Sequence, residues 1–418
     1  MKPSSASRSA ADVASDGGKT GPLRGLRVLD ISTIVAAPTA PTAAALLGDY
    51  GAQVTKIELP GSGDGLRNFA PFKEGRSLWW KATNRDKRLL TLDLRHPRAR
   101  PIFGALLAET DVLIENFRPG TLDGWGWSRD ALWQAQPRLV ILRATAFGQD
   151  GPYAARPGFA RVFEAMGGLA YITGSPEGPP MHAGYPIGDA IGGLFGALGV
   201  MAALWKRARA PDLPGEDIDL SLTEGVLKLL DFLTLKQELL GESHERSGNL
   251  SQYAAPGGVY RSRDGQWVSL SGSTDAIFAA NCKAIGREDL AANARYATNR
   301  HRCESAAVLN AVFGDWFALH DLDEIVRLFE RAGGTLAPVY SARQIAEDPQ
   351  MRARGFLQAV EDPDHGRVHL PGVVPRFALD PCAIRRTAGG LGVDNADVYG
   401  GLGLAPAELE SLARQRVI

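Results

Sequence analysis

The chain has 418 residues, and its 46 Lys plus Arg against 47 Asp plus Glu leave a formal net charge of −1. It therefore carries no overall positive field that would attract nucleic acid or an acidic membrane surface. Three widely spaced cysteines, Cys282, Cys303 and Cys382, offer neither a disulfide framework nor a zinc site, and they favour a reducing, cytoplasmic location. No H-E-x-x-H, G-x-S-x-G or Walker A motif occurs, so we expect no bound metal and no serine-hydrolase or P-loop chemistry.

Residues 1–21 are rich in Ser, Ala, Gly and Asp, lack the apolar core of a secretory signal, and are predicted to form a disordered tail. Strands are then expected at 26–31, 54–58, 89–92, 112–114 and 139–142, with helices at 42–47 and 99–109. This alternation predicts a doubly wound parallel sheet. The loop after the first strand lacks G-x-G-x-x-G, which argues against a nicotinamide dehydrogenase. The uncharged run 190–205 is shorter than the roughly 20 residues of a membrane span and predicts a buried helix.

A Pro-rich break at 211–215 separates this region from a different pattern. A strand at 218–222 and a helix at 224–240 are expected first, then a strand at 267–270 and helices at 274–285, 304–317 and 322–332. This second region is mixed and lacks βαβ alternation. From Pro338 buried-strand runs return. The pattern predicts a large domain at 22–210, a linker and smaller domain at 211–335, and a return of 336–418 to the large domain.

Asp189 is the most informative residue, because it stands at the start of the uncharged run beside Gly188, Gly192 and Gly193. A carboxylate with a reference pKa of about 3.9 is ionised at neutral pH and needs no base to act as a nucleophile. The glycines allow a ligand to approach closely and favour backbone N–H groups that could hold an oxyanion or phosphate. An Asp before an apolar helix is more often a simple N-cap, so both interpretations stay open.

Three further segments could carry function. Residues 115–120 follow a strand, where Asn116 could hydrogen-bond a base or amide and Phe117 could stack, although a turn closed by Pro-Gly is the commoner explanation. The basic cluster 84–88, with Arg95 beyond it, could pair with phosphates or could be a solvated charge run. The loop 147–159 leads to Glu164, which is otherwise a plain surface carboxylate.

These segments, in this order, resemble one family: the class III coenzyme A transferases, whose relatives include formyl-CoA transferase, carnitine CoA-transferase and α-methylacyl-CoA racemase. The resemblance runs from about Leu23 to Ile418. It rests on an ordered set of short motifs at 25–30, 56–58, 87–93, 115–117, 148–152, 186–189, 398–399 and 402–404.

The resemblance implies an α/β fold with a Rossmann-like large domain and a smaller α+β domain, each chain forming a ring that interlocks with a second subunit in a homodimer. It implies a CoA-transferase that moves CoA from an acyl-CoA donor to a carboxylic acid acceptor, with Asp189 as the covalent nucleophile. The reaction would pass through a mixed anhydride and an aspartyl-CoA thioester, with CoA as a substrate and not a permanently bound cofactor. The family's CoA-contacting positions match Leu92, Arg95, Asn116 and Phe117.

This chain departs from the family at several positions. Phe159 stands where the racemases carry a catalytic His, and Ala160 stands where many transferases keep an acidic residue. Glu164, one turn further on, is a candidate replacement, and with Gly188, Gly192 and Gly193 it completes the candidate substrate or oxyanion contacts. The loop 34–41 is longer than in formyl-CoA transferase, and a CoA-contacting Arg of that enzyme falls on Gly124, next to Trp125 and Trp127. The alternatives are an acyl-CoA racemase or isomerase of the same fold, and a non-catalytic CoA-binding protein.

Overall fold

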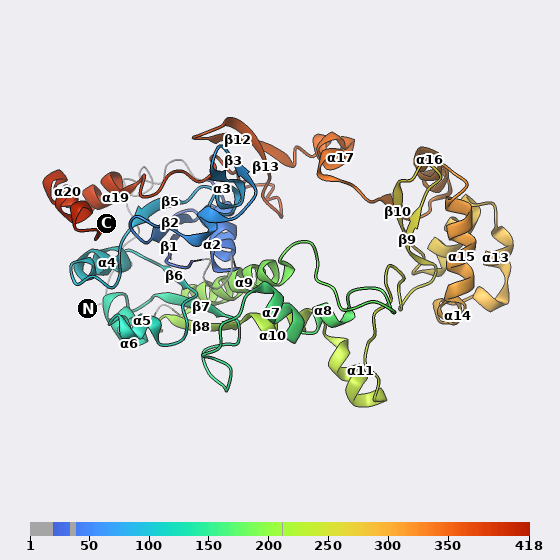
Figure 1. The fold of residues 1–418 in the computed structure, drawn as a ribbon, viewed down its shortest axis with the longest axis horizontal. Coiled ribbons are helices and arrows are strands. Elements are labelled where there is room, and N and C mark those ends of the chain that lie inside the picture. Colours follow the sequence, from blue (N-terminus) through green and yellow to red (C-terminus); the bar gives the residue numbers. More distant parts are fainter. Residues whose placement is uncertain (1–19, 34–38, 211) are drawn as a thin grey trace. The chain divides into compact units, whose positions relative to one another are not determined.

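A computed structural model describes residues 20–33, 39–210 and 212–418 (Figure 1). Contacts divide the chain into two compact units, of which the first holds the residues up to 169 together with 183–232 and 353–418. The second unit holds 170–182 and 233–352. The last sixty-odd residues therefore pack with the N-terminal part of the chain.

Most of the predicted tail and residues 34–38 of the 34–41 loop lie outside the described residues. The last two residues of the predicted tail are held in place. The Thr20 hydroxyl donates to the carbonyl of Pro381 at 2.7 Å, and the Gly21 N–H donates to the carboxylate of Asp380 at 3.0 Å. Thr20 and Gly21 are therefore ordered, contrary to the prediction for these two residues.

A six-stranded parallel sheet forms the centre of the first unit. Its strands are β1 (Arg27–Asp30), β2 (Gln53–Glu58), β5 (Arg88–Thr91), β6 (Val112–Glu115), β7 (Val140–Thr145) and β8 (Glu216–Ser221). They lie in the order β5-β2-β1-β6-β7-β8, and every neighbouring pair is parallel. In chain order this is third, second, first, fourth, fifth, sixth, the arrangement of a doubly wound sheet. The predicted α/β class with a parallel sheet is confirmed.

Successive residues of the central strands face opposite sides of this sheet. Leu29, Leu113 and Ile141 pack against α4 (Ala99–Ala108), α6 (Arg129–Ala135), α19 (Asn395–Gly401) and α20 (Pro406–Arg414). Val28, Val112 and Val140 pack against α2 (Thr39–Asp49) and α9 (Ile187–Arg209). Helices therefore cover both faces, which explains why these strands read as apolar runs without alternation.

The helix α9 is longer than the uncharged run that predicts it. With 23 residues it is long and apolar enough to cross a membrane, by length and composition, although half of its most apolar window is buried inside the protein. The length argument against a membrane span is therefore wrong, and the packing of α9 on the sheet is what identifies it as a core helix. A Cβ at Gly196 would lie 3.0 Å from Leu142 and 3.3 Å from Ala43, so glycine here lets α9 approach β7 and α2 closely.

Two predictions about the rest of the chain are wrong. The helix expected at 224–240 is two helices, α10 (Leu222–Leu229) and α11 (Phe232–Leu240), because α10 buries Leu222 and Val226 in the first unit and the chain leaves that unit after Phe232. The strands β12 (Leu357–Asp362) and β13 (Gly366–Pro371) form a half-exposed antiparallel hairpin and do not extend the buried sheet. The remaining elements of the first unit are η2 (Gly65–Asn68), β3 (Phe72–Lys73), β4 (Arg76–Ser77), α3 (Leu78–Thr83), α5 (Thr121–Gly124) and α7 (Ala160–Met166).

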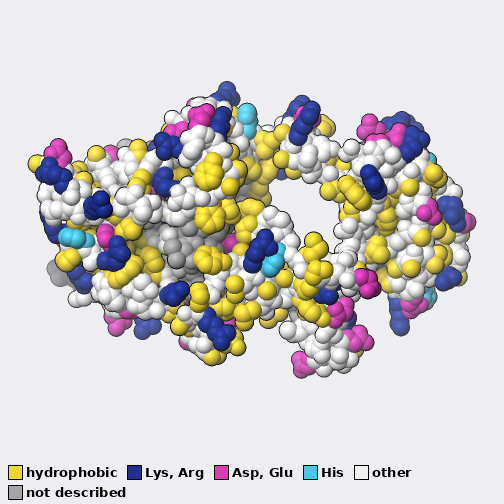
Figure 2. Space-filling model, viewed as in Figure 1, with side chains coloured by type: hydrophobic (Ala, Val, Ile, Leu, Met, Phe, Trp, Pro, Cys, Tyr) yellow, Lys and Arg dark blue, Asp and Glu magenta, His cyan; other side chains and the backbone are white. Residues whose placement is uncertain are grey.

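The second unit has its own core around a small antiparallel sheet of β9 (Gly257–Arg261), β10 (Trp267–Ser271) and β11 (Leu336–Pro338). Its other elements are α12 (Asp275–Ala284), α13 (Glu288–Ala292), η3 (Ala294–Tyr296), α14 (Asn299–Glu304), α15 (Ala306–Phe317), α16 (Leu322–Ala332), α17 (Ala342–Glu347) and α18 (Pro349–Ala353), and α8 (Leu169–Ile172) leads into it. Figure 2 shows positive and negative side chains interspersed over the face in view, in keeping with the near-zero net charge.

Candidate functional site

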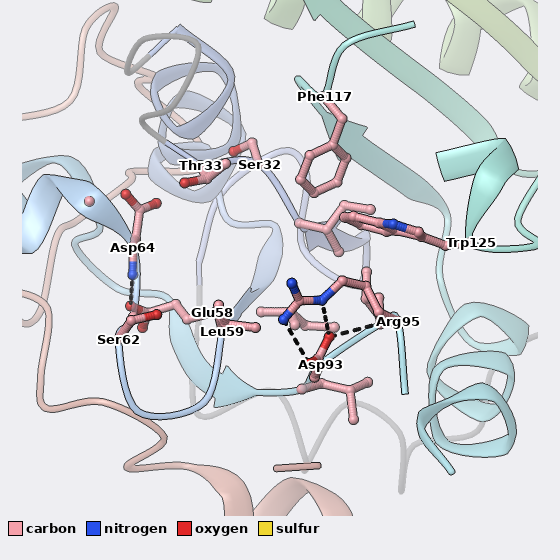
Figure 3. A pocket seen from close by; sticks show the side chains of 16 residues that line it. Ser32, Thr33, Glu58, Leu59, Ser62, Asp64, Asp93, Arg95, Phe117 and Trp125 are labelled. Carbon is pink, nitrogen blue, oxygen red and sulfur yellow. Dashed lines mark hydrogen bonds and ion pairs between the residues drawn. The ribbon is translucent and has the colours of Figure 1, made fainter. Parts of the chain in front are cut away.

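A cavity of about 310 Å³ opens at the carboxyl edge of the central sheet. Its lining comes from the ends of four neighbouring strands and the segments that follow them: 31–33 after β1, 57–59 and 62–65 around the end of β2, 92–95 after β5, and Phe117 after β6, with Trp125 completing it. The strand order reverses between β1 and β6, and ligands of doubly wound sheets bind in the crevice at that point. Figure 3 shows Phe117 and Trp125 on the opposite side of the cavity from Glu58, Ser62 and Asp64.

Three of the four predicted CoA-contacting residues line this cavity: Leu92, Arg95 and Phe117. The fourth, Asn116, is buried behind it. Its side-chain oxygen accepts from the Thr33 N–H at 2.9 Å, and its amide nitrogen donates to the Thr33 carbonyl at 2.7 Å. Asn116 thus fixes the backbone of a residue that lines the cavity. The sequence predicts that these four residues lie near one another. It does not show which of them line the cavity and which hold a lining residue in place.

The charged groups of the cavity are paired. Arg95 donates from Nε and one Nη to the two carboxylate oxygens of Asp93, at 2.7 and 2.8 Å (Figure 3). These hydrogen bonds hold the pKa of Asp93 below its usual value. Across the cavity, Arg67 makes the same two-pronged contact with Glu58, at 2.6 and 2.7 Å. Asp93, the last residue of the 87–93 motif, therefore lines the cavity, and Arg67, which no motif signals, holds the lining residue Glu58 in place.

A buried ionic cluster supports the floor of the cavity. The Lys87 ammonium lies 2.8 Å from the Asp30 carboxylate, and the Lys56 ammonium donates to the Ser32 carbonyl at 2.6 Å and lies 3.1 Å from the Asp64 carboxylate. Burial alone would raise the pKa of Asp30, but the charges of Lys56 and Lys87 outweigh it and lower that pKa. Burial lowers the pKa of Lys87 to about 8. Through these contacts the cluster holds the 30–33 segment in place.

The basic segment 84–88 does not form the solvated charge run that the sequence allows. Lys87 is buried against Asp30, and Arg85 donates from Nε to the Asp49 carboxylate at 2.8 Å. Both side chains are engaged in ion pairs within the unit and are not free surface charges.

Glu115 contacts the backbone of Phe117. Its carboxylate accepts from the Phe117 N–H at 2.6 Å and lies 3.3 Å from the Arg143 guanidinium, which also contacts Asp217 at 3.0 Å. Burial raises the pKa of Glu115 to about 7, against the opposing charge of Arg143. This carboxylate therefore fixes the backbone that carries the Phe117 ring.

Asp189 lies in the first turn of α9, buried to 2% exposure. The helix starts at Ile187 and its N-cap is Pro186, so the interpretation of Asp189 as the N-cap is wrong. As the third helical residue, Asp189 lies in the first turn of α9, at the positive end of the helix dipole. Asp189 does not line the cavity at the sheet edge.

Glu164 is buried, with 2% of its surface exposed. The interpretation of Glu164 as a surface carboxylate is therefore wrong. Its Oε1 accepts from the Gly188 N–H at 2.9 Å. A Cβ at Gly188 would lie 2.6 Å from the Phe163 ring, so only glycine lets α7 and α9 pack this closely. Glu164 thus occupies the Gly188 N–H, one of the donors that the sequence assigns to an oxyanion.

Gly192 and Gly193 lie further inside α9 and are buried. Beyond the first turn, helical N–H groups bond to the carbonyl four residues earlier. These two glycines therefore offer no free first-turn donor, and the geometry does not support them as oxyanion contacts.

Aromatic side chains surround the start of α9. Tyr185 lies four residues before Asp189, and its ring centroid is 6.0 Å from that of Trp79, which is 6.1 Å from that of Phe69. Burial and the nearby negative charge of Asp189 raise the pKa of Tyr185. Of these three aromatic residues, Trp79 and Phe69 have no counterpart among the predicted site residues.

The predicted residues thus form two groups within the first unit: Leu92, Arg95, Asn116 and Phe117 at the sheet edge, and Glu164, Gly188 and Asp189 at the start of α9. Across the described residues, no group of three or more His, Cys, Asp or Glu is placed to hold a metal ion.

Comparison with known proteins identifies this arrangement. The model of the family described as CoA-transferase family III matches residues 23–395. The chain belongs to CoA-transferase family III. As a member of this family, and among relatives that are named CoA-transferases, it is a transferase enzyme that uses CoA thioesters as substrates. The predicted family is confirmed.

Relatives of this family-III chain include two proteins of Chloroflexus aurantiacus. The chain is 39% identical over 405 residues to the succinyl-CoA–L-malate CoA-transferase beta subunit, and 36% identical over 399 residues to succinyl-CoA–D-citramalate CoA-transferase, each covering 95% of this chain and 98% of the relative. Among solved structures, a CAIB/BAIF family protein from Brucella suis matches with a TM-score of 0.79 and 29% identity, covering 92% of this chain and 100% of that one.

Proposed function

We propose that this family-III enzyme moves CoA between an acyl-CoA donor and a carboxylic acid acceptor through a covalent intermediate on Asp189. The observation that carries the proposal is a buried carboxylate in the first turn of a glycine-rich helix, at the position where the family resemblance places the catalytic Asp. Ionised carboxylates are competent nucleophiles toward thioesters when they are desolvated and oriented.

The reaction is balanced without any co-reactant. An Asp189 oxygen attacks the thioester carbonyl, the C–S bond breaks, and a mixed anhydride and CoA thiolate result. The thiolate then attacks the aspartyl carbonyl of the anhydride, which releases the donor acid and leaves an aspartyl-CoA thioester. The acceptor carboxylate attacks this thioester and expels the thiolate, and the thiolate finally attacks the new acyl carbonyl to give the product and regenerate Asp189.

The cavity at the sheet edge is the proposed CoA site. Leu92 and Phe117 would contact the nucleotide half directly, Arg95 would meet phosphate oxygens at the mouth, and Asn116 would hold Thr33 in place. Glu164 would position the turn that carries Asp189.

The α-proton chemistry of the racemases has no support at the matching position. Phe159 precedes α7, is half exposed, and has no ionisable group that could move a proton. The donor and acceptor are proposed from relatives: succinyl-CoA as the donor, and a small hydroxylated dicarboxylic acid such as malate or citramalate as the acceptor.

We further propose a cytoplasmic homodimer in which Rossmann-like and smaller domains form interlocked rings. One face of α9 supports self-association, because Leu194, Leu198 and Trp205 share it and are 60%, 64% and 65% exposed. Sedimentation equilibrium should give the mass of two chains, and the mass of one chain at micromolar concentration would contradict the dimer.

The test of the mechanism is trapping of the intermediate. Wild-type protein mixed with succinyl-CoA and then with hydroxylamine should carry a hydroxamate on the peptide that contains Asp189, and Asp189→Ala should lose both this label and CoA transfer. Asp212→Asn, an exposed aspartate after α9, is the matched control and should retain both. Transfer that persists in a folded Asp189→Ala protein would refute the proposal.

A further inference from the structure

The cavity at the sheet edge has one wall that the family resemblance does not account for. Trp125 lines it, half-buried, next to Gly124, the position at which formyl-CoA transferase carries a CoA-contacting Arg. Its indole meets the Phe117 ring edge-to-face, with ring centroids 5.0 Å apart and an angle of 67° between planes. Because the two rings of this aromatic corner are steeply inclined to one another, a flat ligand can stack on one of them and meet the other only at an angle.

The rest of the lining is apolar near these rings and charged at the rim. Four aliphatic side chains line the cavity: Ile31, Ile57, Leu92 and Leu94. Figure 3 shows the paired side chains of Asp93 and Arg95 below Trp125. Of the parts of CoA, only the adenine base is flat, aromatic and uncharged. The phosphates need cations and water, which the rim and not the aromatic corner provides.

The corner is held rigidly. The backbone N–H of Phe117 donates to the buried Glu115 carboxylate. The backbone N–H of Trp125 donates to the carbonyls of Thr121 and Leu122 at 3.3 and 3.2 Å. The turn of α5 that carries Trp125 begins after Gly120, whose φ of 79° lies in the left-handed region that favours glycine. A preorganised wall loses little conformational freedom when a ligand binds.

We propose that Trp125 stacks on the adenine base of CoA while the Phe117 ring contacts the base at an angle, and that Trp125 is a specificity-determining residue for the nucleotide half of the substrate. This rests on the proposed function, since it requires CoA in this cavity. Removal of one base-stacking ring typically weakens binding by about 5- to 150-fold.

The experiment compares Trp125→Ala and Trp125→Phe with Trp127→Phe as the matched control. Trp127 is two residues away but is buried against Phe103, with centroids 4.8 Å apart, and does not line the cavity. Calorimetry with adenosine 3′,5′-bisphosphate measures the nucleotide half alone. We expect affinity at least fivefold weaker in Trp125→Ala, partly restored in Trp125→Phe, and unchanged in Trp127→Phe.

Intrinsic fluorescence gives a second readout that does not depend on activity. The bisphosphate should quench part of the tryptophan emission in wild type and in Trp127→Phe, and this quenching should disappear in Trp125→Phe. Labelling of Asp189 by an acyl-pantetheine thioester, which lacks the nucleotide, should be equal in wild type and in Trp125→Ala.

The outcomes separate the two proposals. Wild-type affinity for the bisphosphate in a folded Trp125→Ala protein, or quenching that survives in Trp125→Phe, overturns the role of Trp125 while Asp189 labelling can still stand. Failure of wild-type protein to bind CoA or to label Asp189 overturns the proposed function and, with it, this inference.

Discussion

Glu164→Ala tests how the turn that carries Asp189 is held. The substitution removes the carboxylate that accepts the Gly188 N–H at 2.9 Å inside the protein. A buried donor that loses its acceptor costs about 1–3 kcal/mol. If this free-energy cost appears as a higher barrier to the attack by Asp189, because the first turn of α9 is no longer held in place, the attack should slow by about 5- to 150-fold. The conversion is that about 1.4 kcal/mol is a factor of ten in rate.

The assay is single-turnover labelling of Asp189 by succinyl-CoA, followed by mass spectrometry, alongside calorimetric CoA affinity and thermal unfolding. Glu164→Gln retains an acceptor oxygen of the same shape, so it should recover most of the labelling rate. Glu177→Ala, an exposed glutamate, is the control and should match wild type. A merely structural role would lower the unfolding temperature and leave the labelling rate of the folded fraction unchanged.

The reasoning is refuted if Glu164→Ala labels Asp189 at the wild-type rate with unchanged stability. It is also refuted if Glu164→Gln is as impaired as Glu164→Ala, because the negative charge, and not the hydrogen bond to Gly188, would then be the essential feature.

Two further predictions follow from the same unit. Gly188→Ala should lower the unfolding temperature and the labelling rate, because the added Cβ would lie 2.6 Å from the Phe163 ring. Gly199→Ala in the same helix is the control: its Cβ would lie 3.5 Å from Ile218, so it should be neutral or stabilise the fold by up to about 1 kcal/mol. Equal effects at the two sites would contradict the packing argument. The raised pKa of Glu115, about 7 against 4.5, means that the folded state binds its proton more tightly, so its contribution to stability is present below about pH 4.5 and is lost as the pH rises to about 7. Chemical denaturation of Glu115→Gln should lack this pH-dependent loss, and identical profiles for variant and wild type would contradict it.

The sequence alone predicted five of the six strands of the central sheet, because their signal is local, but it placed the strand at 218–222, which forms β8, in the linker and smaller domain. Short, mostly apolar runs at 26–31, 112–114 and 139–142, separated by helical patterns, predict strands buried on both faces. The ordered motifs were also sufficient for the family, since they lie where the chain must keep particular residues at strand ends. Leu92, Arg95 and Phe117 therefore came together at one cavity as their positions predicted.

Only the tertiary structure decided the environment of each group. Glu164 is buried because α7 packs on the start of α9, a contact that depends on Gly188 and Phe163 and has no periodic signal in the sequence. Lys87 is neutralised by Asp30, 57 residues away, and Arg67 pairs with Glu58 around a loop. Charge state and burial depend on such long-range partners, and for that reason Asp189 could be singled out from the sequence while its position inside the first turn, and not at the cap, could not.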